Sequence, residues 1–373
     1  MWVNRLRLLH RPGSAILRAM NLLMNKMSGM NFLQQCLRLG LVVSLAGLVG
    51  PSQPAFAAEN LSNTQVMPEP VLKSKAPPAV AKGFQLPPGI TVVSDLKYGP
   101  NGDANLLDIY RPEKFEGLLP LVVWIHGGGW ANGDKSPSPQ FLQMIPMGFA
   151  VASINYRLSG QAPFPAQIFD CKGAIRWLRA HAKEYQLDPD HIGVWGLSAG
   201  GHLVALLGTS GGVKELEGDV GGNLDVSSRV QAVSDYAGPT DMSQFWAQAA
   251  PNNAFWPAKG HSYFDLLFGK GPLEDHPDLV RMANPIIYIT ADDPPFQIFH
   301  GEKDTSVPFG QGQILADALK AKGVPCEFTP LPTMGHGFGQ GQYRMTFAFF
   351  EKHLKPAAKP ATAPGAAPVA PGK

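Results

Sequence analysis

A run of five residues, Gly196-Leu197-Ser198-Ala199-Gly200, limits the possible fold of this chain more than any other stretch. The residues before it, 191–195, are apolar and partly β-branched, as in a buried strand, and 201–207 have the pattern of a helix. A strand that turns into a helix within one residue strains the backbone there, and side chains two positions away would collide with the neighbouring chain. Glycines at both positions avoid this collision. The run therefore predicts a serine exposed on a sharp strand-to-helix turn.

The pattern Gly-x-Ser-x-Gly is weak evidence when taken alone. The chain has 41 Gly in 373 residues, and a chain of such composition contains about 0.2 copies by chance. The surrounding pattern supplies the missing context, because strands and helices alternate along the chain. This alternation predicts an α/β fold with a mostly parallel central sheet and helices on both faces. Strands are predicted at 90–93, 106–110, 121–125, 149–155, 230–236, 296–299 and 326–331, and helices at 166–185, 313–322 and 345–354.

The first 57 residues differ in composition from the rest. They contain six Lys or Arg and no acidic residue. An apolar run of about 12 residues, 39–50, precedes the small-residue sequence Ala55-Phe56-Ala57. This order predicts a signal peptide over 1–57, cleaved after Ala57 or Ala58, and an exported protein, periplasmic or secreted. A membrane span needs roughly 20 apolar residues, so none is expected after cleavage.

The remaining sequence divides into a linker, one domain and a tail. Residues 58–88 predict a Pro-rich linker, 89–355 carry the periodic pattern of a folded domain, and 356–373 predict a disordered Pro/Ala-rich tail. Without residues 1–57, 25 basic residues stand against 29 acidic ones. This balance favours neither nucleic acid nor an anionic membrane surface as a partner. Cys171 falls on an apolar helical stripe, which predicts a buried free thiol.

The pattern loosens at about 240–285, where we expect a small cap inserted over the strand ends. Its aromatic side chains could line a pocket for an acyl group, stack on a sugar, or hold the cap on the domain. The sequence leaves these alternatives open. The rings belong to Phe245, Trp246, Phe255, Trp256, Tyr263, Phe264 and Phe268.

A second motif, His126-Gly127-Gly128-Gly129-Trp130, follows the predicted central strand 121–125. Consecutive glycines let the backbone turn its N–H groups toward a ligand without steric hindrance, and an oxyanion hole is built from such donors. The alternative is a flexible turn. Because Trp130 directly follows the loop, it is predicted to contact a bound substrate.

A serine hydroxyl becomes nucleophilic when a base removes its proton, and that base needs an acid to orient it. Asp304 follows the strand 296–299, and His336 lies in a glycine loop after the strand 326–331. Parallel strands place their outgoing loops at one edge of the sheet, where Ser198 also lies. The sequence therefore predicts Ser198, Asp304 and His336 as nucleophile, acid and base.

Other residues compete for these roles. Asp241 also flanks a strand, whereas Asp292 and Asp293 precede theirs and would emerge at the far edge. His202 and His300 are predicted to be packed or hydrogen-bonded structural histidines, and His126 to shape the glycine loop.

The motifs HGGGW, GLSAGG, HGEKD followed by VP, and GHGF together resemble those of the α/β hydrolase superfamily. The chain is similar to its bacterial feruloyl and acetyl xylan esterases, with kinship to the hormone-sensitive-lipase branch, over roughly 91–354. The resemblance implies an α/β hydrolase fold with a catalytic domain at 89–355. It also implies the backbone N–H groups of Gly128, Gly129 and Ala199 as the oxyanion hole, with Gly127 as an alternative donor.

These features predict an exported serine carboxylic ester hydrolase that acts on a small-molecule or carbohydrate ester. No cofactor or metal is expected, because the mechanism needs neither and no His-Glu-x-x-His spacing occurs. Two alternatives stay open: a peptidase of the prolyl-oligopeptidase type, and a catalytically silent hydrolase scaffold that acts as a binding module.

Overall fold

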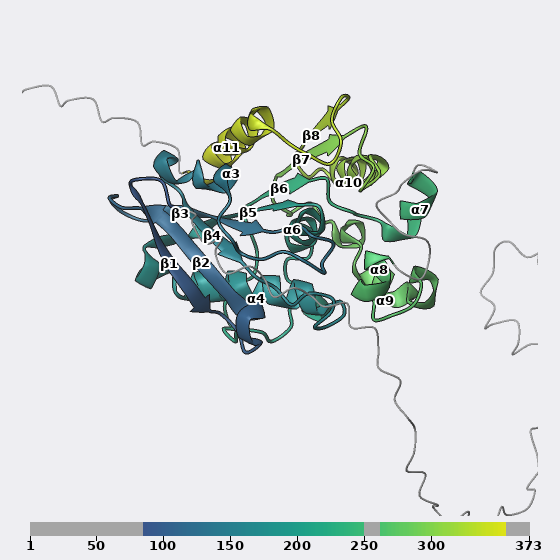
Figure 1. Cartoon of the computed structure of the whole chain (residues 1–373), viewed down its shortest axis with the longest axis horizontal. Coiled ribbons are helices and arrows are strands. Elements are labelled where there is room, and N and C mark those ends of the chain that lie inside the picture. Colours follow the sequence, from purple (N-terminus) through teal and green to yellow (C-terminus); the bar gives the residue numbers. More distant parts are fainter. Residues whose placement is uncertain (1–84, 250–261, 356–373) are drawn as a thin grey trace, which may run out of the picture. The chain divides into compact units, whose positions relative to one another are not determined.

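A computed structural model describes residues 85–249 and 262–355. The predicted signal peptide, the linker up to residue 84, residues 250–261 of the cap and the predicted tail lie outside the described residues. The described part is built on one eight-stranded sheet with the order β1-β2-β4-β3-β5-β6-β7-β8 (Figure 1). The predicted α/β fold is therefore present.

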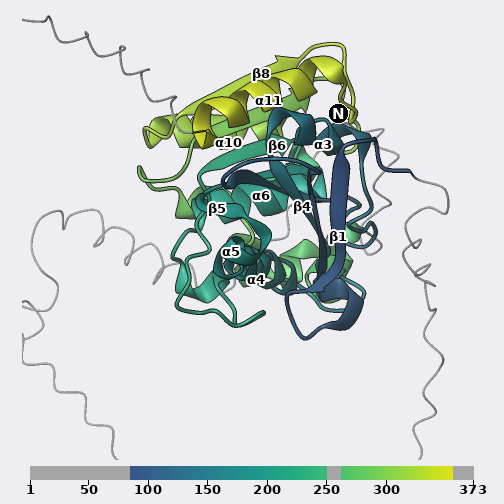
Figure 2. The same cartoon turned by 90° about the vertical axis from the view of Figure 1, so that its left-hand side faces the viewer.

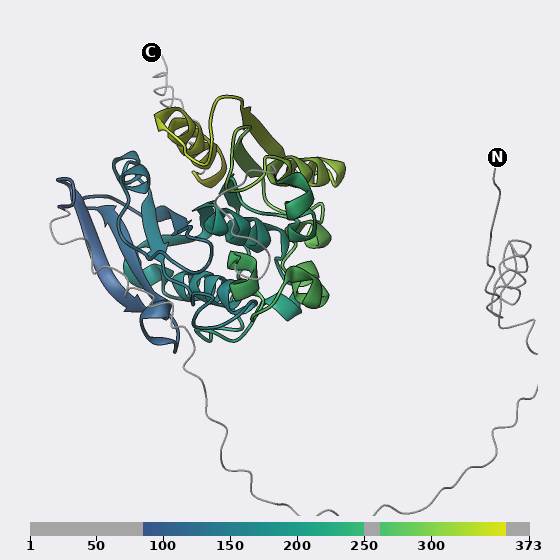
Figure 3. The ribbon, with the colours of Figure 1, turned by 45° about the vertical axis from the view of Figure 1, so that its right-hand side comes forward.

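The sheet is mostly parallel, as predicted. Only β1 with β2 and β2 with β4 pair antiparallel among the described strands; the other neighbours are parallel. In Figure 3 the blue N-terminal strands lie at the left of the domain and the yellow-green C-terminal elements along its top. The strands are β1 (Ile90–Lys97), β2 (Leu106–Pro112), β3 (Leu119–Ile125), β4 (Ala150–Ile154), β5 (Leu187–Leu197), β6 (Ala232–Tyr236), β7 (Phe296–Gly301) and β8 (Cys326–Leu331).

Helices cover both faces of the sheet (Figures 1 and 2). The α-helices are α3 (Pro139–Leu142), α4 (Ala166–Ala180), α5 (Ala182–Tyr185), α6 (Ala199–Thr209), α7 (Phe245–Gln248), α8 (Tyr263–Leu267), α9 (Pro277–Met282), α10 (Gly310–Ala321) and α11 (Gln340–Leu354). The short 3₁₀ helices are η1 (Gly102–Asn105), η2 (Ile145–Met147), η3 (Lys214–Leu216), η4 (Met242–Gln244), η5 (Leu273–Asp275) and η6 (Pro285–Tyr288).

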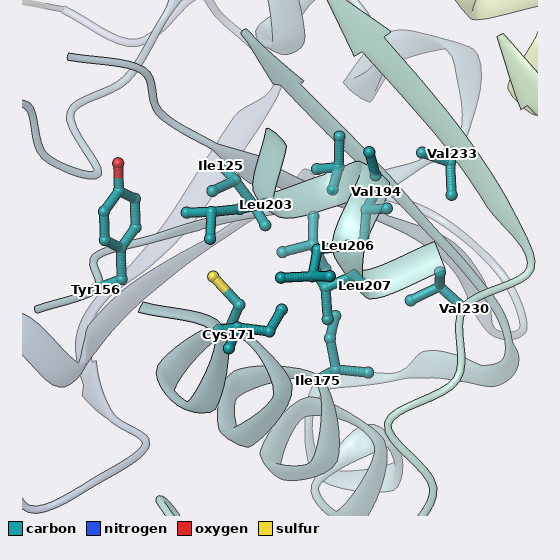
Figure 4. Packing of buried hydrophobic residues seen from close by; sticks show 14 of the residues in the cluster. Ile125, Tyr156, Cys171, Ile175, Val194, Leu203, Leu206, Leu207, Val230 and Val233 are labelled. Carbon is teal, nitrogen blue, oxygen red and sulfur yellow. The ribbon is translucent and has the colours of Figure 1, made fainter. Parts of the chain in front are cut away.

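Side chains of the central strands alternate between two hydrophobic cores, as the twofold periodicity of a strand requires. Val123 and Ile125 of β3 pack into the core on the side of α4, α6 and α10, and Trp124 packs on the side of α3 and α11. Figure 4 shows Leu203 and Leu206 of α6 between the strands and α4. The helix that follows the serine turn is thus enclosed by apolar side chains.

The predicted helix 166–185 is wrong in one respect, because it is interrupted at His181. This residue has φ −99° and ψ 11°, outside helical values. Its Nδ1–H donates to the Trp177 carbonyl at 2.8 Å, and the two rings stack 4.2 Å apart. The Trp177 carbonyl also accepts the His181 backbone N–H at 3.0 Å, so α4 keeps its last helical bond. The interruption lies in the backbone angles of His181, and α5 begins afresh at Ala182.

The buried thiol and the absence of long apolar helices are also visible in the described part. Cys171 is buried and free, as predicted. No helix within 85–249 or 262–355 combines the length and apolar character needed to cross a membrane.

Replacement of Gly193 by valine should destabilise the fold. A Cβ on Gly193 of β5 would lie 2.7 Å from the ring of Phe350 and 2.8 Å from a methyl carbon of Leu354, both on α11. Overpacking of this kind lowers the free energy of unfolding by about 1–3 kcal/mol, so urea should unfold Gly193→Val at a lower concentration than the wild type.

Gly341→Ala is the matched control, because Gly341 lies on α11 and an added Cβ there meets nothing within 4 Å. Alanine is favoured over glycine in a helix by roughly 0.5–1 kcal/mol, so this variant should be at least as stable as the wild type. Equal stability of Gly193→Val and the wild type would contradict the packing of α11 on β5.

Candidate active site

Ser198 occupies the turn between β5 and α6 with φ 59° and ψ −122°. A positive φ is uncommon for a residue with a side chain, and it strains the backbone. The Ser198 N–H donates to the Tyr236 carbonyl of β6 at 2.8 Å, and its carbonyl accepts from the His202 N–H of α6 at 3.0 Å. These bonds hold the strained residue between the sheet and the helix.

The two glycines that flank the serine are required by close backbone approaches. A Cβ on Gly196 would lie 2.3 Å from the Gly200 carbonyl oxygen. A Cβ on Gly200 would lie 2.1 Å from the Ile125 carbonyl oxygen at the end of β3. The predicted steric reason for both glycines is therefore confirmed, and the second contact brings the end of β3 against the serine turn.

Asp304 and His336 are joined by a short hydrogen bond. The Nδ1–H of His336 donates to Asp304 Oδ2 at 2.6 Å. Asp304 is enclosed, with a side-chain exposure of 0%, and its Oδ1 accepts the backbone N–H groups of Ser306 and Val307 at 2.7 and 2.9 Å. Both carboxylate oxygens are thus fixed, and the imidazole keeps only Nε2 for another partner.

Ser198 and His336 line the same cavity, which has a volume of about 170 Å³. Within the described residues no hydrogen bond joins their side chains. A general base must come within hydrogen-bond reach of the proton that it removes, and such bonds often tighten only when substrate is bound. The structure therefore brings the three predicted residues to one edge of the sheet, with Asp304 behind His336.

The glycine loop also lines this cavity, through Gly127, Gly128 and Gly129. Gly128 and Gly129 have φ values of 104° and 61°, which favour glycine. In the part of the chain that the structure describes, neither N–H is paired with a protein acceptor. Ala199 is the first residue of α6, where backbone N–H groups have no partner within the helix. All three predicted oxyanion donors thus border the cavity.

His126 fixes the direction of the Gly127 peptide. Its Nδ1–H donates to the Gly127 carbonyl at 2.8 Å, and its ring stacks on Tyr156 with 4.3 Å between centroids. Burial lowers the pKa of His126 to about 4, so the ring is neutral. The C=O and N–H of a trans peptide point in opposite directions. Holding the Gly127 carbonyl against His126 therefore directs the Gly128 N–H away from that imidazole.

Trp130 borders the cavity, but its side chain is fully buried. Its indole N–H donates to His202 Nδ1 at 3.3 Å, and its ring lies 5.8 Å from that of Phe264 in the cap. His202 Nε2–H donates in turn to the Ala283 carbonyl at 2.7 Å. These contacts give Trp130 a supporting role for the loop; its predicted contact with substrate stays a prediction.

The competing residues lie in other settings. Burial lowers the pKa of His202 to about 4, which agrees with its predicted structural role. His300 is buried, donates Nε2–H to the Val307 carbonyl at 3.0 Å and lies behind Asp304. Asp241 accepts bonds from Ser243 and Gln244. The other two candidates also lie apart from His336: Asp292 pairs with Arg229, and Asp293 accepts from Thr290.

A polar network around the buried Lys135 was not foreseen from the sequence. The Lys135 ammonium bonds to Asp108 at 2.7 Å and to Asp95 at 2.8 Å, and its backbone N–H donates to Asn155 at 2.6 Å. Burial alone would lower the pKa of Lys135, but the two carboxylates raise it. The only signal in the sequence is one lysine soon after the HGGGW motif, and its partners are far away along the chain.

The aromatic residues of the predicted cap lie in two settings. Phe245, Phe264 and Phe268 are buried and hold the cap on the domain. Trp246 lines a separate cavity, and the Tyr263 ring lies so close to Gly129 that a Cβ there would be 2.7 Å from it. Phe255 and Trp256 lie outside the described residues.

No cluster of three or more His, Cys, Asp or Glu side chains arranged to hold a metal ion occurs within the described ranges.

The chain was compared with families and proteins already known. The family model BD-FAE matches residues 107–319, which include the glycine loop, Ser198 and Asp304. This match spans more than half of the chain. The chain belongs to the BD-FAE family. His336 lies beyond the matched range, on the loop that follows β8.

Relatives of this BD-FAE chain include proteins named as esterases. It is 35% identical to esterase LipQ of Mycobacterium tuberculosis over 66% of this chain and 57% of that protein. A truncated form of a carbohydrate esterase from gut microbiota is 34% identical, with a TM-score of 0.65, over 70% of this chain and 95% of that one. An acetyl ester-xyloside bifunctional hydrolase from Caldicellulosiruptor lactoaceticus is 27% identical, with a TM-score of 0.56, over 66% and 87%. The chain spans about half the length of the curated relatives that it matches.

Asp235, near the end of β6, is a buried carboxylate below the catalytic edge of this BD-FAE domain. Its Oδ1 accepts the Gly238 N–H at 2.9 Å, whereas Oδ2 has no partner among the described residues. Burial raises its pKa to about 7. The sequence signal for a buried carboxylate here is an acidic residue inside the apolar run 230–236, which was not foreseen as a buried site.

The stabilisation that protonated Asp235 gives the domain should fall as the pH rises from about 4 to about 7. The folded protein holds this proton with a pKa of about 7, against an ordinary value of 3.8. Raising the pH toward 7 removes a proton that the fold favours, so this contribution to the free energy of unfolding should decrease by on the order of 1 kcal/mol per pH unit. Burial lowers the pKa of His126 and His202 from 6.5 to about 4, so each of them adds stability as the pH rises from about 4 to 6.5. The effect of Asp235 is therefore measured as a difference between the wild type and a variant at the same pH.

Asp235→Asn should lack this contribution, because an amide oxygen can still accept the Gly238 N–H and carries no charge. The free energy of its unfolding in urea should therefore increase relative to that of the wild type as the pH rises from about 5 to 7. The exposed Asp292→Asn is the control and should keep the wild-type pH dependence. Identical slopes for wild type and Asp235→Asn would contradict the assignment.

Proposed function

We propose that this protein is an exported serine carboxylic ester hydrolase that acts on acyl esters of carbohydrates. The observation that carries the proposal is one small cavity bordered by Ser198, by the Asp304-bound His336 and by the glycine loop. The N–H groups of Gly128 and Gly129 in this loop have no protein acceptor among the described residues. Nucleophile, base and oxyanion donors are the three parts that acyl transfer needs. Relatives named as esterases support the same reaction class.

The proposed reaction has two steps. His336 Nε2 takes the Ser198 proton while Oγ bonds to the ester carbonyl carbon, and the backbone donors stabilise the negative oxygen. The tetrahedral species collapses, the bond to the alcohol oxygen breaks, and this oxygen leaves with the proton from His336. His336 then deprotonates a water molecule, which attacks the carbonyl carbon of the acyl-serine. The bond from this carbon to Ser198 Oγ breaks, the acid leaves, and His336 returns the proton to Ser198 Oγ.

The charge that His336 acquires is stabilised by Asp304. This carboxylate is fully enclosed and already accepts two backbone N–H groups, so it is oriented before the reaction begins. Preorganised partners need no reorganisation as charge develops, and this lowers the barrier.

Two observations support a carbohydrate ester as substrate. Solved structures similar to this chain are named as a carbohydrate esterase and as an acetyl ester-xyloside hydrolase. The Tyr263 ring also lies close to Gly129, which lines the cavity of Ser198, and Trp246 lines a neighbouring cavity. Export is proposed from residues 1–57, since plant and microbial polysaccharides are met outside the cell.

Ser198→Ala should lower kcat for p-nitrophenyl acetate by a factor on the order of 10⁴ or more, because the nucleophile is lost. His336→Ala and Asp304→Asn should each cause a comparable loss, and Asp292→Asn should stay within about twofold of the wild type because Asp292 lies apart from the site. Equally slow hydrolysis by wild type and Ser198→Ala would refute the proposal. Failure of a fluorophosphonate probe to label Ser198 would favour a silent scaffold, and cleavage of proline peptides would favour a peptidase.

Expression of the full chain in a Gram-negative host should yield a mature protein in the periplasm or medium that begins at Ala58 or Glu59. N-terminal mass spectrometry measures this directly. A chain that keeps its first 57 residues in the cytoplasm would refute export and leave the reaction proposal standing.

A further inference from the structure

A second cavity, of about 320 Å³, lies in the cap. Its apolar part consists of Trp246, Leu273 and Val280, and its polar part includes Asp241, Arg281 and Asn284. These residues come from η4, α7, η5 and α9 and from the turn after α9. None of them belongs to the site described above, so the cavity has no role in the reaction steps.

Two connections place this cavity beside the catalytic one. Pro239 lines the catalytic cavity, and Asp241, two residues later, lines the second. The Trp246 ring lies 5.9 Å from that of Phe264, which lies 5.8 Å from Trp130 at the glycine loop. The two cavities are therefore neighbours, close along the chain and joined by one row of packed rings.

The wall of the second cavity is also attached to the glycine loop by hydrogen bonds. Asn284 follows Ala283, whose carbonyl accepts Nε2–H of His202, and His202 accepts the indole N–H of Trp130. His202 and Trp130 are both fully buried, so these bonds are shielded from water. The position of this wall relative to the oxyanion donors is therefore fixed.

The polar groups of the cavity supply both acceptors and donors. The Asp241 carboxylate accepts from the Ser243 N–H and hydroxyl and from the Gln244 amide, at 3.1, 2.5 and 2.6 Å. A carboxylate has about four acceptor positions, so one is left. The Arg281 guanidinium makes no hydrogen bond or salt bridge within the described residues, and Asn284 Oδ1 accepts from Ile286, which leaves its NH₂ as a donor.

These features select the chemistry of the ligand. A long acyl chain would remove water from Asp241 and Arg281 without replacing their hydrogen bonds, which is unfavourable. An anionic ligand would meet the carboxylates of Asp241 and Glu274, and a cationic ligand would meet the Arg281 guanidinium. A neutral pyranose fits both surfaces, because its C–H face is apolar and its hydroxyl groups both donate and accept.

We propose that the cavity of Trp246, Asp241, Arg281 and Asn284 is a subsite for a pyranose ring in the alcohol part of the ester. This inference rests on the proposed esterase function and specifies where its substrate is recognised. The indole face contacts the C–H face of the ring, and Arg281 and Asn284 donate to its hydroxyl oxygens.

The first experiment compares kcat/KM for acetylated xylotriose with kcat/KM for ethyl acetate, whose alcohol part is too small to reach the subsite, by measuring released acetate. Trp246→Ala and Arg281→Ala should each lower this ratio at least tenfold, mainly through KM, and Trp246→Phe should restore part of it. Arg344→Ala is the control for loss of an exposed arginine, because Arg344 lies on α11, away from the cap. It should leave the ratio unchanged.

The second experiment measures binding without catalysis. Calorimetric titration of Ser198→Ala with unacetylated xylotriose, cellotriose and mannotriose should detect binding of at least one sugar, with Kd raised at least tenfold by adding Trp246→Ala or Arg281→Ala. This result would support the subsite even if the wild type hydrolysed no ester, in which case only the proposed function would fail.

Three results would overturn the subsite. One is a ratio that changes less than twofold in both variants, and another is the lack of binding by all three sugars. The third is an equal loss of activity toward p-nitrophenyl octanoate, which would identify the cavity as an acyl pocket.

Discussion

The left-handed backbone of Ser198 is the constraint on which the rest of the site depends. A strand that becomes a helix at a single residue can do so only where the surrounding chain comes very close, and Gly196 and Gly200 make this possible. The approach of Gly200 to the Ile125 carbonyl brings the end of β3 against the turn. The glycine loop that leaves β3 is thereby placed beside the serine hydroxyl, so one backbone constraint positions both the nucleophile and the proposed oxyanion donors.

Burial assigns different tasks to the histidines around this turn. His126 and His202 are enclosed and kept neutral, so each can donate one ring N–H to a backbone carbonyl and hold a loop in place. His336 is partly exposed, borders the cavity and is paired with a carboxylate. A positive charge on an imidazole is stabilised only where such a partner exists. The protein thus separates histidines that position the loop from the one proposed to carry a proton.

The cap and the glycine loop form one connected wall. Phe264 packs between Trp130 and Trp246, and His202 links Trp130 to the backbone next to Asn284. Because these contacts are buried, a change in the cap would alter the position of the loop that carries the backbone donors. Recognition of the alcohol part and stabilisation of the oxyanion are therefore mechanically coupled in the proposed reaction.

The sequence by itself determined the sheet, the serine turn and the order of the chemical groups, because these follow from local periodicity and from glycines at fixed spacing. It also placed Asp304 and His336 after successive strands, whose outgoing loops share one edge. It failed at His181, where the backbone leaves helical angles within a regular helical pattern. Only the tertiary structure decided the neutrality of His126 and His202, the raised pKa of Asp235, the Lys135 network and the cavity in the cap. Each of these depends on desolvation or on contacts between residues far apart in the chain, and neither leaves a periodic signal in the sequence.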